Sequence, residues 1–553
     1  MTRVLTIAMF FLLAFRAEGA NLIDVNRLPD SVSVVTDDAS LDMNRAGAGW
    51  KADGVSVETT QTGGHSGIHV SLSAPHTGVK KIVMRWDGTF DPATRVVGDA
   101  WERAYGDLHW GPVDPNRPLP WYFMANAANQ TDGYGVMTGP ASMCCWAAGP
   151  DGVRLTIDVR SGGVGVQLGA RTLDACTIVT HTGTPAESPY LAEREFCKLM
   201  CPHPRLPKSP VYGFNDWYCT YGKNTADNFL KDAAYITSLS PTGTNKPYMV
   251  VDDGWQGRRQ GDKSTACPWD HTNAKFGSTM PELARHLHDS GALAGLWYRP
   301  LEAWPDAPAN WRLAYRKDAF DPTVPAVLDQ ISTDIRRFRG WGFDLLKHDF
   351  STEEITGQWG RNMHDQLGHD GWSFADKSKT TAEVLLNLYK TIREAAGDGM
   401  IIDGCNTVGH LSAGLFELQR IGDDTSGTEW KRTREMGVNC LAFRSPQQGT
   451  FFFIDADCAG LAKADAVPWE LNRQWLDLLA RSGTPLFVSW PQRLASPDQE
   501  AALRAALNSA SAVQPTAEPI DWMTTRTPGK WLLNGKQADF DWFIGPDHQT
   551  NGH

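Results

Sequence analysis

The sequence has no excess of basic charge. Its 553 residues include 52 Lys and Arg against 64 Asp and Glu, which gives a formal net charge of -12, and no basic cluster stands out. A protein that binds nucleic acid must neutralise phosphates, so this balance argues against a nucleic-acid partner. No His pair stands at metal-ligand spacing at the ends of the strands that are predicted below, which argues against a metal-dependent hydrolase. We expect no metal and no other cofactor.

Long apolar runs are absent beyond the first 20 residues. Arg3 precedes an apolar run at 4–15, and small residues at 17–20 stand at a plausible cleavage spacing. This pattern is typical of a secretory signal peptide, whereas the run is short for a membrane span. We therefore expect residues 1–20 to be removed. The mature protein is then secreted or periplasmic, with no membrane contact.

All ten cysteines lie beyond this segment. An exported chain can oxidise its thiols, and the candidates for disulfides are Cys144, Cys145, Cys197 and Cys201. The sequence does not determine how they pair. No matching His or Cys pair follows Cys197 and Cys201, so a zinc site is not indicated. The oligomeric state is not determined either.

Two different patterns divide the remaining chain, as its length leads us to expect of a multidomain protein. Residues 21–205 contain short alternating runs between turn residues, which is typical of an antiparallel β-sandwich. In 206–510, amphipathic segments alternate with apolar runs at 211–217, 248–252, 293–297, 343–347, 400–403, 418–421, 451–454 and 486–490. Repeated strand–helix units of this number predict a (β/α)8 barrel. Residues 511–553 contain two strand-like runs and predict a short C-terminal β appendage.

The stretch 342–351 is central to this interpretation. An apolar strand there ends in Lys347, His348 and Asp349. If this stretch is considered in isolation, a structural ion pair between Lys347 and Asp349 would explain it. However, polar residues also follow other predicted strands, namely Asp252, Asp253, Cys405, Arg420, Asp423 and Asp424. Because the carboxyl ends of barrel strands converge on one face, these side chains are expected to meet.

Two separated carboxylates are what glycoside hydrolysis requires. One attacks the anomeric carbon, and the other donates a proton to the leaving oxygen and then takes one from water. Adjacent Asp residues can accept hydrogen bonds from sugar hydroxyls, and a Trp ring can stack on a sugar. Asp252 and Asp253 could also cap a helix or bind calcium. Four strand ends with carboxylate, amine and guanidinium groups on one rim favour an active site.

The segment 248–256, with Asp-Asp-Gly-Trp-Gln at its end, resembles the signature of the retaining α-galactosidase clan. That clan comprises glycoside hydrolase families 27 and 36 and the raffinose-synthase-like proteins. Leu345-Leu-Lys-His-Asp349 resembles the clan's nucleophile strand, and Gly404-Cys-Asn406 followed by 420–424 resembles its fifth and sixth strand ends. The likeness covers about 205–490, and the preceding β-sandwich suits family 36 more than family 27.

The resemblance implies a role for each matching position. Asp349 is the expected nucleophile, and Asp423 or Asp424 the acid/base. The spacing from Arg420 favours Asp424 by comparison with family 27, whereas the Gly-Asp-Asp context favours Asp423 by comparison with family 36, and we prefer Asp423. The residues expected to bind the sugar or to form the wall around it are Asp252, Asp253, Lys347, Arg420, Cys405, Trp217, Trp255 and Trp297.

Three positions depart from the clan's pattern. His348 stands where family 36 usually has an aromatic residue, Ser351 where Asn is common, and Arg299 where Glu is often found. Arg299 either contacts an acidic or substituted sugar or forms a salt bridge at the rim. The sequence as a whole predicts an exported, retaining hydrolase of terminal α-linked galactose or a close relative. The alternatives are a raffinose-synthase-type transglycosylase and a sugar-binding protein without turnover.

Overall fold

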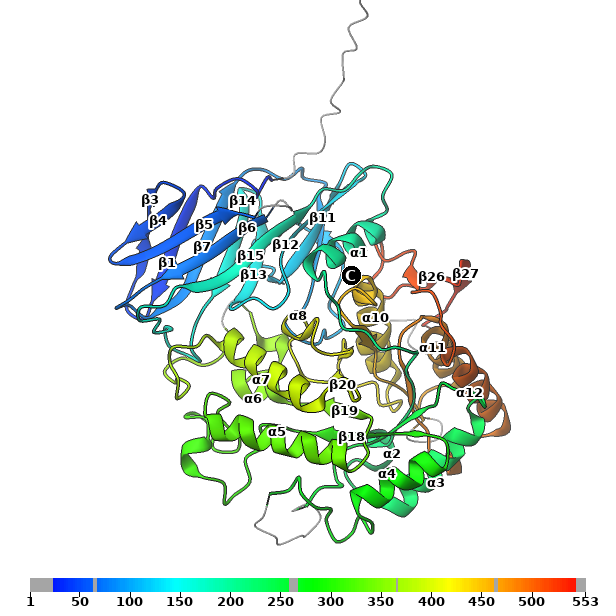
Figure 1. Ribbon diagram of the computed structural model, residues 1–553. Coiled ribbons are helices and arrows are strands. Elements are labelled where there is room, and N and C mark those ends of the chain that lie inside the picture. The colour runs from blue at the N-terminus through cyan, green and yellow to red at the C-terminus, as the bar shows by residue number, and fades with distance from the viewer. Residues whose placement is uncertain (1–22, 63–66, 258–266, 365–366, 462–465, 544–553) are drawn as a thin grey trace, which may run out of the picture.

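The computed structural model describes residues 23–62, 67–257, 267–364, 367–461 and 466–543 (Figure 1). The expected signal peptide, 1–20, lies outside them. In chain order the structure consists of two antiparallel sheets, a parallel sheet with surrounding helices, and a small three-stranded sheet. This confirms the predicted fold class of a β-sandwich, a barrel and a short C-terminal β segment. The domain limits at 205 and 510 stay predictions.

The two antiparallel sheets pack through an aromatic core. The ring of Phe123 in one sheet lies edge-on to Trp146 in the other, with centroids 6.0 Å apart. The six-stranded sheet has the order β10 (Leu119–Pro120), β13 (Met143–Gly149), β14 (Gly152–Asp158), β7 (Val79–Asp87), β1 (Ser31–Thr36), β2 (Ser40–Asp42). The nine-stranded sheet has the order β3 (Asn44–Ala46), β4 (Gly49–Ala52), β5 (Val55–Gln61), β6 (Gly67–Ser73), β15 (Leu173–His181), β12 (Gln130–Val136), β11 (Tyr122–Ala127), β8 (Arg95–Gly98), β9 (Gly111–Pro112).

The parallel sheet closes into a barrel. Its order is β22 (Phe453–Asp455), β21 (Leu418–Arg420), β20 (Ile401–Gly404), β19 (Leu345–His348), β18 (Leu293–Tyr298), β17 (Tyr248–Val251), β16 (Tyr212–Asn215), β24 (Leu486–Ser489), β23 (Cys458–Gly460). Only Ala456 and Asp457 separate the two end strands, β22 and β23, in the chain. One interrupted strand therefore joins both edges, and nine strands occupy eight barrel positions. Every predicted strand lies within two residues of its expected bounds.

Amphipathic helices surround the barrel (Figure 1). The main ones are α3 (Ala226–Leu239), α4 (Met280–Asp289), α5 (Pro325–Gly340), α7 (Thr381–Ala396), α11 (Trp469–Arg481) and α12 (Pro497–Ala510). Thr279 and Thr380 begin α4 and α7 with capping boxes, in which the hydroxyl accepts the N–H of the Glu three residues later. The glutamate in turn accepts the cap's own N–H, so two backbone donors without helical partners are satisfied.

The segment between β8 and β9 connects the antiparallel sheets to the barrel. The backbone N–H of Ala104 donates to the Ile421 carbonyl at 2.8 Å, directly after β21. Asp99 forms an ion pair with Arg444, with Oδ1 and Nε 3.0 Å apart. Because this segment is bonded to the barrel's upper loops, it delivers side chains to the barrel's carboxyl-end face.

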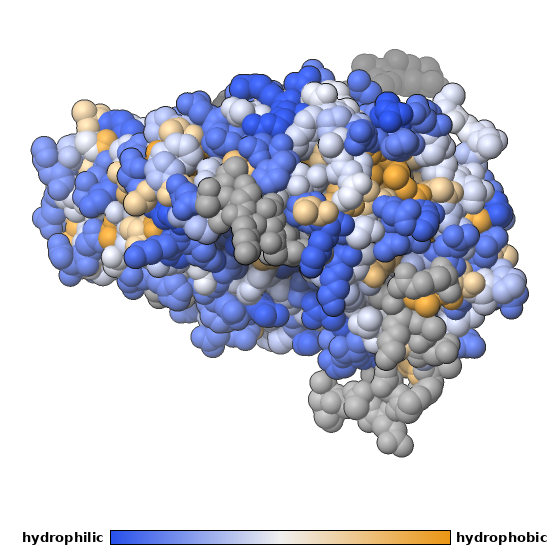
Figure 2. Space-filling view, turned by 90° about the horizontal axis from the view of Figure 1, so that it is seen from below, coloured by the Kyte–Doolittle hydropathy of each residue, from blue (hydrophilic) through white to orange (hydrophobic). Residues whose placement is uncertain are grey.

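Two shorter elements complete the fold. Helix α1 (Pro189–Met200) packs on β12 and β15 before the chain enters the barrel. The C-terminal sheet comprises β25 (Glu518–Pro519), β26 (Lys530–Leu533) and β27 (Lys536–Asp539). Near this sheet, the rings of Trp522 and Trp110 lie 5.6 Å apart, so the C-terminal segment also contacts the N-terminal region. Figure 2 shows a mostly hydrophilic face with apolar residues in small groups, as expected for a surface in water.

The candidate disulfides are not formed: none of the ten cysteines, each of which is among the described residues, is part of a disulfide bond. Cys144 and Cys145 are neighbours in β13, so their side chains point to opposite faces of the sheet. Cys197 has its Sγ 3.9 Å from the Tyr122 hydroxyl, and the backbone N–H of Cys201 caps α1. In the described part of the chain, no helix is long and apolar enough to cross a membrane.

Candidate active site

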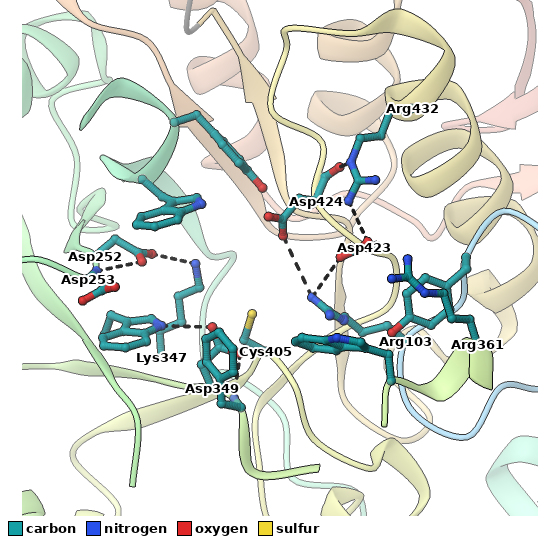
Figure 3. A pocket seen from close by; sticks show the side chains of 16 residues that line it. Arg103, Asp252, Asp253, Lys347, Asp349, Arg361, Cys405, Asp423, Asp424 and Arg432 are labelled. Atoms are coloured by element: carbon teal, nitrogen blue, oxygen red, sulfur yellow. Dashed lines mark hydrogen bonds and ion pairs between the residues drawn. The ribbon is translucent and has the colours of Figure 1, made fainter. Parts of the chain in front are cut away.

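A cavity of about 420 Å³ opens at the carboxyl ends of the barrel strands (Figure 3). Nine of the twelve predicted site residues line it: Trp217, Asp252, Asp253, Trp297, Lys347, Asp349, Cys405, Asp423 and Asp424. They come from widely separated parts of the chain. Parallel barrel strands all point their carboxyl ends to one face, which is why the residues after them meet.

Asp349 directly follows β19 and is held by two fixed donors. The indole Nε1–H of Trp297 donates to Oδ2 at 3.0 Å, and the backbone N–H of Phe350 donates to Oδ1 at 2.8 Å. Phe350 has a φ of 69°, a conformation that is unfavourable for a residue with a bulky side chain. Such strain is typical of functional sites, where the surrounding structure holds the backbone in place. Here it fixes the direction of the Asp349 carboxylate.

Asp252 and Lys347 form a buried ion pair at one end of the cavity. The Lys347 Nζ lies 2.7 Å from Asp252 Oδ2, which also accepts a hydrogen bond from Asn215 Nδ2 at 2.9 Å. Burial acts to lower the pKa of Lys347, but the Asp252 carboxylate outweighs it and the pKa is raised well above its ordinary value. Lys347 is therefore charged at neutral pH. Asp253 accepts a hydrogen bond from Gln256 Nε2 at 2.7 Å.

Asp423 and Asp424 follow β21 and have different surroundings. Asp423 lies between two guanidinium groups, with Arg103 Nη1 at 3.2 Å and Arg432 Nη2 at 2.6 Å. Burial alone would raise the pKa of Asp423, but these two arginines lower it below its ordinary value. Asp424 pairs with Arg420 at 3.0 Å and has Arg103 at 3.9 Å. Burial nevertheless raises the pKa of Asp424.

The segment after β8 contributes Arg103 and Tyr105 to the cavity, and sequence reasoning missed both. The Arg103 guanidinium lies 5.0 Å from the ring centroid of Trp359. Glu102 is fully buried beneath them, and accepts hydrogen bonds from the Tyr105 hydroxyl and from the Gly360 N–H, the latter at 2.9 Å. The segment carries no sequence pattern that indicates contact with barrel loops such as the one that holds Asn406, 304 residues after Glu102, so only the tertiary fold reveals it.

Five further residues that line the cavity were not predicted, namely Tyr218, Phe350, Trp359, Arg361 and Arg432. Phe350 directly follows Asp349, and its nearness in sequence could have indicated it. Tyr218 is the neighbour of the predicted Trp217. The other three lie in loops that follow the strands, where no periodicity indicates which side chains face inward.

Three predicted residues lie outside the cavity wall. Trp255 is fully buried behind it and donates its Nε1–H to the Trp297 carbonyl at 3.1 Å. Arg420 is also buried, where it pairs with Asp457 at 2.7 Å and places Nη1 3.6 Å from Cys405 Sγ. Arg299 forms the salt bridge that was one of its two alternatives, with Glu354 Oε1 at 2.7 Å. These three support residues that line the cavity rather than line it themselves.

The other departures from the clan's pattern also point away from the cavity. His348 alternates with Lys347 along β19, so its ring faces the helical layer, 5.7 Å from the Tyr389 ring of α7. Burial lowers the pKa of His348 to about 3, so the ring is neutral. The Ser351 hydroxyl donates to the Asn406 carbonyl at 3.4 Å. Among the described residues, no group of three or more His, Cys, Asp or Glu could hold a metal ion.

A (β/α)8 barrel whose carboxyl-end cavity holds separated carboxylates and aromatic walls has the arrangement of the glycosidase class of barrel proteins. Comparison with known proteins shows which family of that class the chain resembles. Residues 205–409 match the family model described as Melibiase. This match and the similarities to individual proteins confirm that the chain resembles the α-galactosidase clan, and family 36 in particular.

Two proteins named as α-galactosidases match in sequence over short segments. The bifunctional α-galactosidase/sucrose kinase of Mediterraneibacter gnavus is 31% identical over 86 residues, which is 16% of this chain and 9% of that protein. The α-galactosidase Mel36A of Lactobacillus acidophilus is 31% identical over 88 residues, which is 16% of this chain and 11% of that protein. The matched segments therefore span only about a tenth of these relatives.

Solved structures match over most of the chain. The α-galactosidase of Thermus thermophilus, in complex with p-nitrophenyl α-D-galactopyranoside, has a TM-score of 0.57 at 15% identity, and covers 92% of this chain and 98% of its own. A family 36 α-galactosidase variant of Geobacillus stearothermophilus, in complex with raffinose, has a TM-score of 0.55 at 12% identity and covers 82% and 66%. At these identities the likeness shows a shared fold.

Proposed function

We propose that the protein is a glycoside hydrolase that removes terminal α-linked galactose, or a closely related sugar, from oligo- or polysaccharides. The observation that carries this proposal is the arrangement of the cavity. Asp349 and Asp424 line it together, with the Asp252, Asp253 and Lys347 group beside them. The family match over 205–409 and the α-galactosidase relatives support the same activity.

The terminal sugar binds between the acidic end of the cavity and its aromatic walls. Asp252 and Asp253 accept hydrogen bonds from neighbouring sugar hydroxyls, and the charged Lys347 donates one. Trp217 and Trp297 line the same space and offer apolar surface to the sugar ring. The anomeric carbon then lies against Asp349, whose two hydrogen-bond donors hold it in the direction of attack.

Asp349 acts as the nucleophile of a double displacement. Its carboxylate attacks the anomeric carbon and forms a glycosyl ester while the bond to the leaving oxygen breaks, and the acid transfers its proton to that oxygen. The residue that donated this proton then acts as a base and takes a proton from water. The resulting hydroxide attacks the anomeric carbon, the ester bond to Asp349 breaks, and the anomeric configuration is retained.

We assign the acid/base role to Asp424, although the sequence context favoured Asp423. A general acid must hold its proton before the reaction, so a raised pKa suits the role. Burial raises the pKa of Asp424, whereas Arg103 and Arg432 hold Asp423 in its ionised form. Asp423 then serves to orient the two arginines around the leaving group.

Hydrolysis of a panel of aryl α-glycosides tests the activity, with an Asp349→Ala variant beside the unaltered protein. We expect the α-galactoside to be cleaved and the variant to lose at least about a thousandfold in kcat, because no nucleophile remains. Asp289→Ala, at the exposed end of α4, is the matched control that should keep full activity. An inactive wild-type protein, or an active Asp349→Ala variant, would contradict the proposal, and product analysis separates hydrolysis from transfer to a sugar.

We also propose that the protein is exported, because residues 1–20 have the pattern of a signal peptide. Expression of the full chain with its own N-terminus, followed by N-terminal sequencing of the protein outside the cytoplasm, tests this. Cleavage near residue 20 is expected. Recovery of the full-length chain from the cytoplasm alone would argue against export.

A further inference from the structure

The charge lining the cavity is polarised (Figure 3). Asp252 and Asp253 lie at one end, and Arg103, Arg361 and Arg432 lie at the other, beyond Asp423 and Asp424. Neutral sugar hydroxyls explain the acidic end, as proposed above. Three guanidinium groups around the other end are not explained by a neutral sugar alone.

Arg361 differs from the other two arginines in its partners. Arg103 and Arg432 are both within ion-pair distance of Asp423. In the part of the chain that the structure describes, the Arg361 guanidinium forms no ion pair, and its one recorded contact is with the Tyr105 ring, 5.4 Å from the centroid. It is exposed, in the 3-10 turn Gly360–Asn362, and lines the cavity. A cation in this position is available to a ligand.

A second cavity, of about 590 Å³, adjoins the first and shares Arg103, Tyr105 and Arg361 with it. Two more guanidinium groups line this space, and neither forms an ion pair with a carboxylate of the described residues. Arg117 donates to the carbonyls of Val96 and His109, and Arg526 lies 3.2 Å from the His109 ring nitrogen.

Three acidic residues also line the second cavity. Asp99 is paired with Arg444, and Asp107 and Asp114 are solvent-exposed. The guanidinium groups therefore outnumber the available carboxylates locally, in a protein whose net charge is -12. A positive region on a negatively charged molecule concentrates anions where they would otherwise be repelled.

The proposed reaction places the leaving group at this end. When the terminal sugar faces Asp349 and Asp424, its anomeric oxygen is directed toward the acid/base and hence toward the arginines beyond it. The sugar attached to that oxygen therefore extends past Arg361 and into the second cavity.

We propose that Arg361 and the adjoining cavity bind an anionic group, a carboxylate or a sulfate, on the sugar to which the terminal galactose is linked. The guanidinium fork matches the oxygens of both groups and binds them through charge-assisted hydrogen bonds. Arg361 is then a specificity residue for acidic oligosaccharides. This inference rests on the proposed hydrolase function and names its substrate class.

Three disaccharides of the same linkage test the proposal, with galactose α-linked to glucose, to glucuronate and to 6-sulfated glucose. We expect the unaltered protein to favour at least one acidic substrate about tenfold in kcat/KM at low ionic strength, mainly through KM. The preference should shrink in about 0.5 M NaCl, where exposed charges are screened. A preference for glucuronate alone identifies a carboxylate site, and one for the sulfated sugar alone identifies a sulfate site.

Arg361→Gln is the decisive variant. For each protein preparation, the kcat/KM on the acidic disaccharide is divided by the kcat/KM on the neutral one. We expect that ratio to fall to about three or less, because a neutral amide replaces the charged donor. Arg504→Gln, on exposed α12, makes the same change in net charge far from both cavities and should leave the ratio at its wild-type value. Equal kcat/KM on all three disaccharides, or an equal effect of the two variants, would overturn the anion site.

The proposed hydrolysis and the anion site can fail separately. If no disaccharide is cleaved, the hydrolase proposal fails, and calorimetric binding of the same intact disaccharides becomes the test. Tighter binding of an acidic disaccharide, lost in Arg361→Gln, would still support the site. Equal binding, or none, would reject it.

Discussion

At the scale of single residues, neighbouring carboxylates differ because of what surrounds them. Asp423 and Asp424 are adjacent in the chain, yet two arginines lie within 3.2 Å of the first, whereas the second has Arg420 at 3.0 Å and Arg103 only at 3.9 Å. The pKa of Asp423 is lowered and that of Asp424 is raised. A difference of this kind separates a permanent carboxylate from a group that can give up and regain a proton.

Alanine at each position distinguishes their roles. For Asp424→Ala we expect kcat on an unactivated sugar substrate to fall by about 10²- to 10⁴-fold, the contribution of general acid–base catalysis. A 2,4-dinitrophenyl α-galactoside should be affected less in the glycosylation step, because its leaving group needs no proton. Added azide should restore turnover by replacing the base-activated water.

Asp423→Ala is the matched comparison. This variant should have a raised KM for substrates with a leaving-group sugar, because the Asp423 carboxylate orients only Arg103 and Arg432. Azide should not restore its turnover. If azide rescues Asp423→Ala and not Asp424→Ala, the two assignments must be exchanged.

At the scale of elements, the start of α7 connects the barrel to the β-sandwich. Thr380 caps the helix and also donates its hydroxyl to the Ala141 carbonyl at 2.6 Å, in the segment before β13. Thr279 caps α4 with the same motif, but on an exposed surface and with hydrogen bonds only inside its own turn. One capping motif therefore has two different structural consequences.

Replacing each cap with alanine measures the difference. Thr279→Ala should lower the free energy of unfolding by about 1 kcal/mol, the usual cost of a lost N-cap. Thr380→Ala should cost about 2 to 3 kcal/mol, because the part-buried Ala141 carbonyl also loses its donor. Chemical denaturation of both variants, with Thr380→Ser as the control that keeps the hydroxyl, tests this. Equal losses would show that the bond to Ala141 contributes nothing.

At the scale of the whole molecule, buried histidines make stability depend on pH. Burial lowers the pKa of His348 to about 3 and that of His410 to about 4. In the unfolded chain a histidine has a pKa of about 6.5, so below that pH the unfolded state binds protons that the folded state does not. The two histidines therefore make their full contribution to stability above pH 6.5. This contribution is lost as the pH falls toward their pKa values in the folded protein.

His348→Phe should reduce this dependence. When the pH falls from 7.5 to 5, His348 should lower the free energy of unfolding by about 2 kcal/mol, and the variant should not show this loss. Phenylalanine also removes two buried ring nitrogens that have no hydrogen-bond partner among the described residues. Unfolding free energies of the variant and the wild type at both pH values test this. As a control, His286→Gln, at an exposed position on α4, should leave the pH dependence of stability unchanged. If His348→Phe also leaves it unchanged, the prediction is wrong.

The active cavity also depends on the whole molecule. Arg103 and Tyr105 come from the segment after β8, and Arg526 of the adjoining cavity comes from the C-terminal segment. The matched family segment, 205–409, contains none of these residues. The end of the cavity that the proposed reaction assigns to the leaving group is therefore built partly by regions outside the matched segment, although Arg361 lies within it.

Much of the fold and half of the cavity could be predicted from the sequence for a local reason. Apolar runs identify strands, and a parallel barrel brings the residue after each strand to one face. Asp252, Lys347, Asp349 and Asp424 occupy such positions, and the structure brings them together. Their arrangement follows from short stretches of sequence and one topological rule.

The tertiary structure alone decided which side chains face the cavity and what charges surround them. Trp255 and Arg420 lie behind the wall, His348 points to the helical layer, and Arg103 reaches Asp423 from a distant segment. None of this follows from periodicity, because it depends on packing between elements far apart in the chain. The sequence by itself determined the strands and the residues at their ends. Long-range packing decided the electrostatics of Asp423 and Asp424, because a pKa responds to neighbouring charges and burial in space.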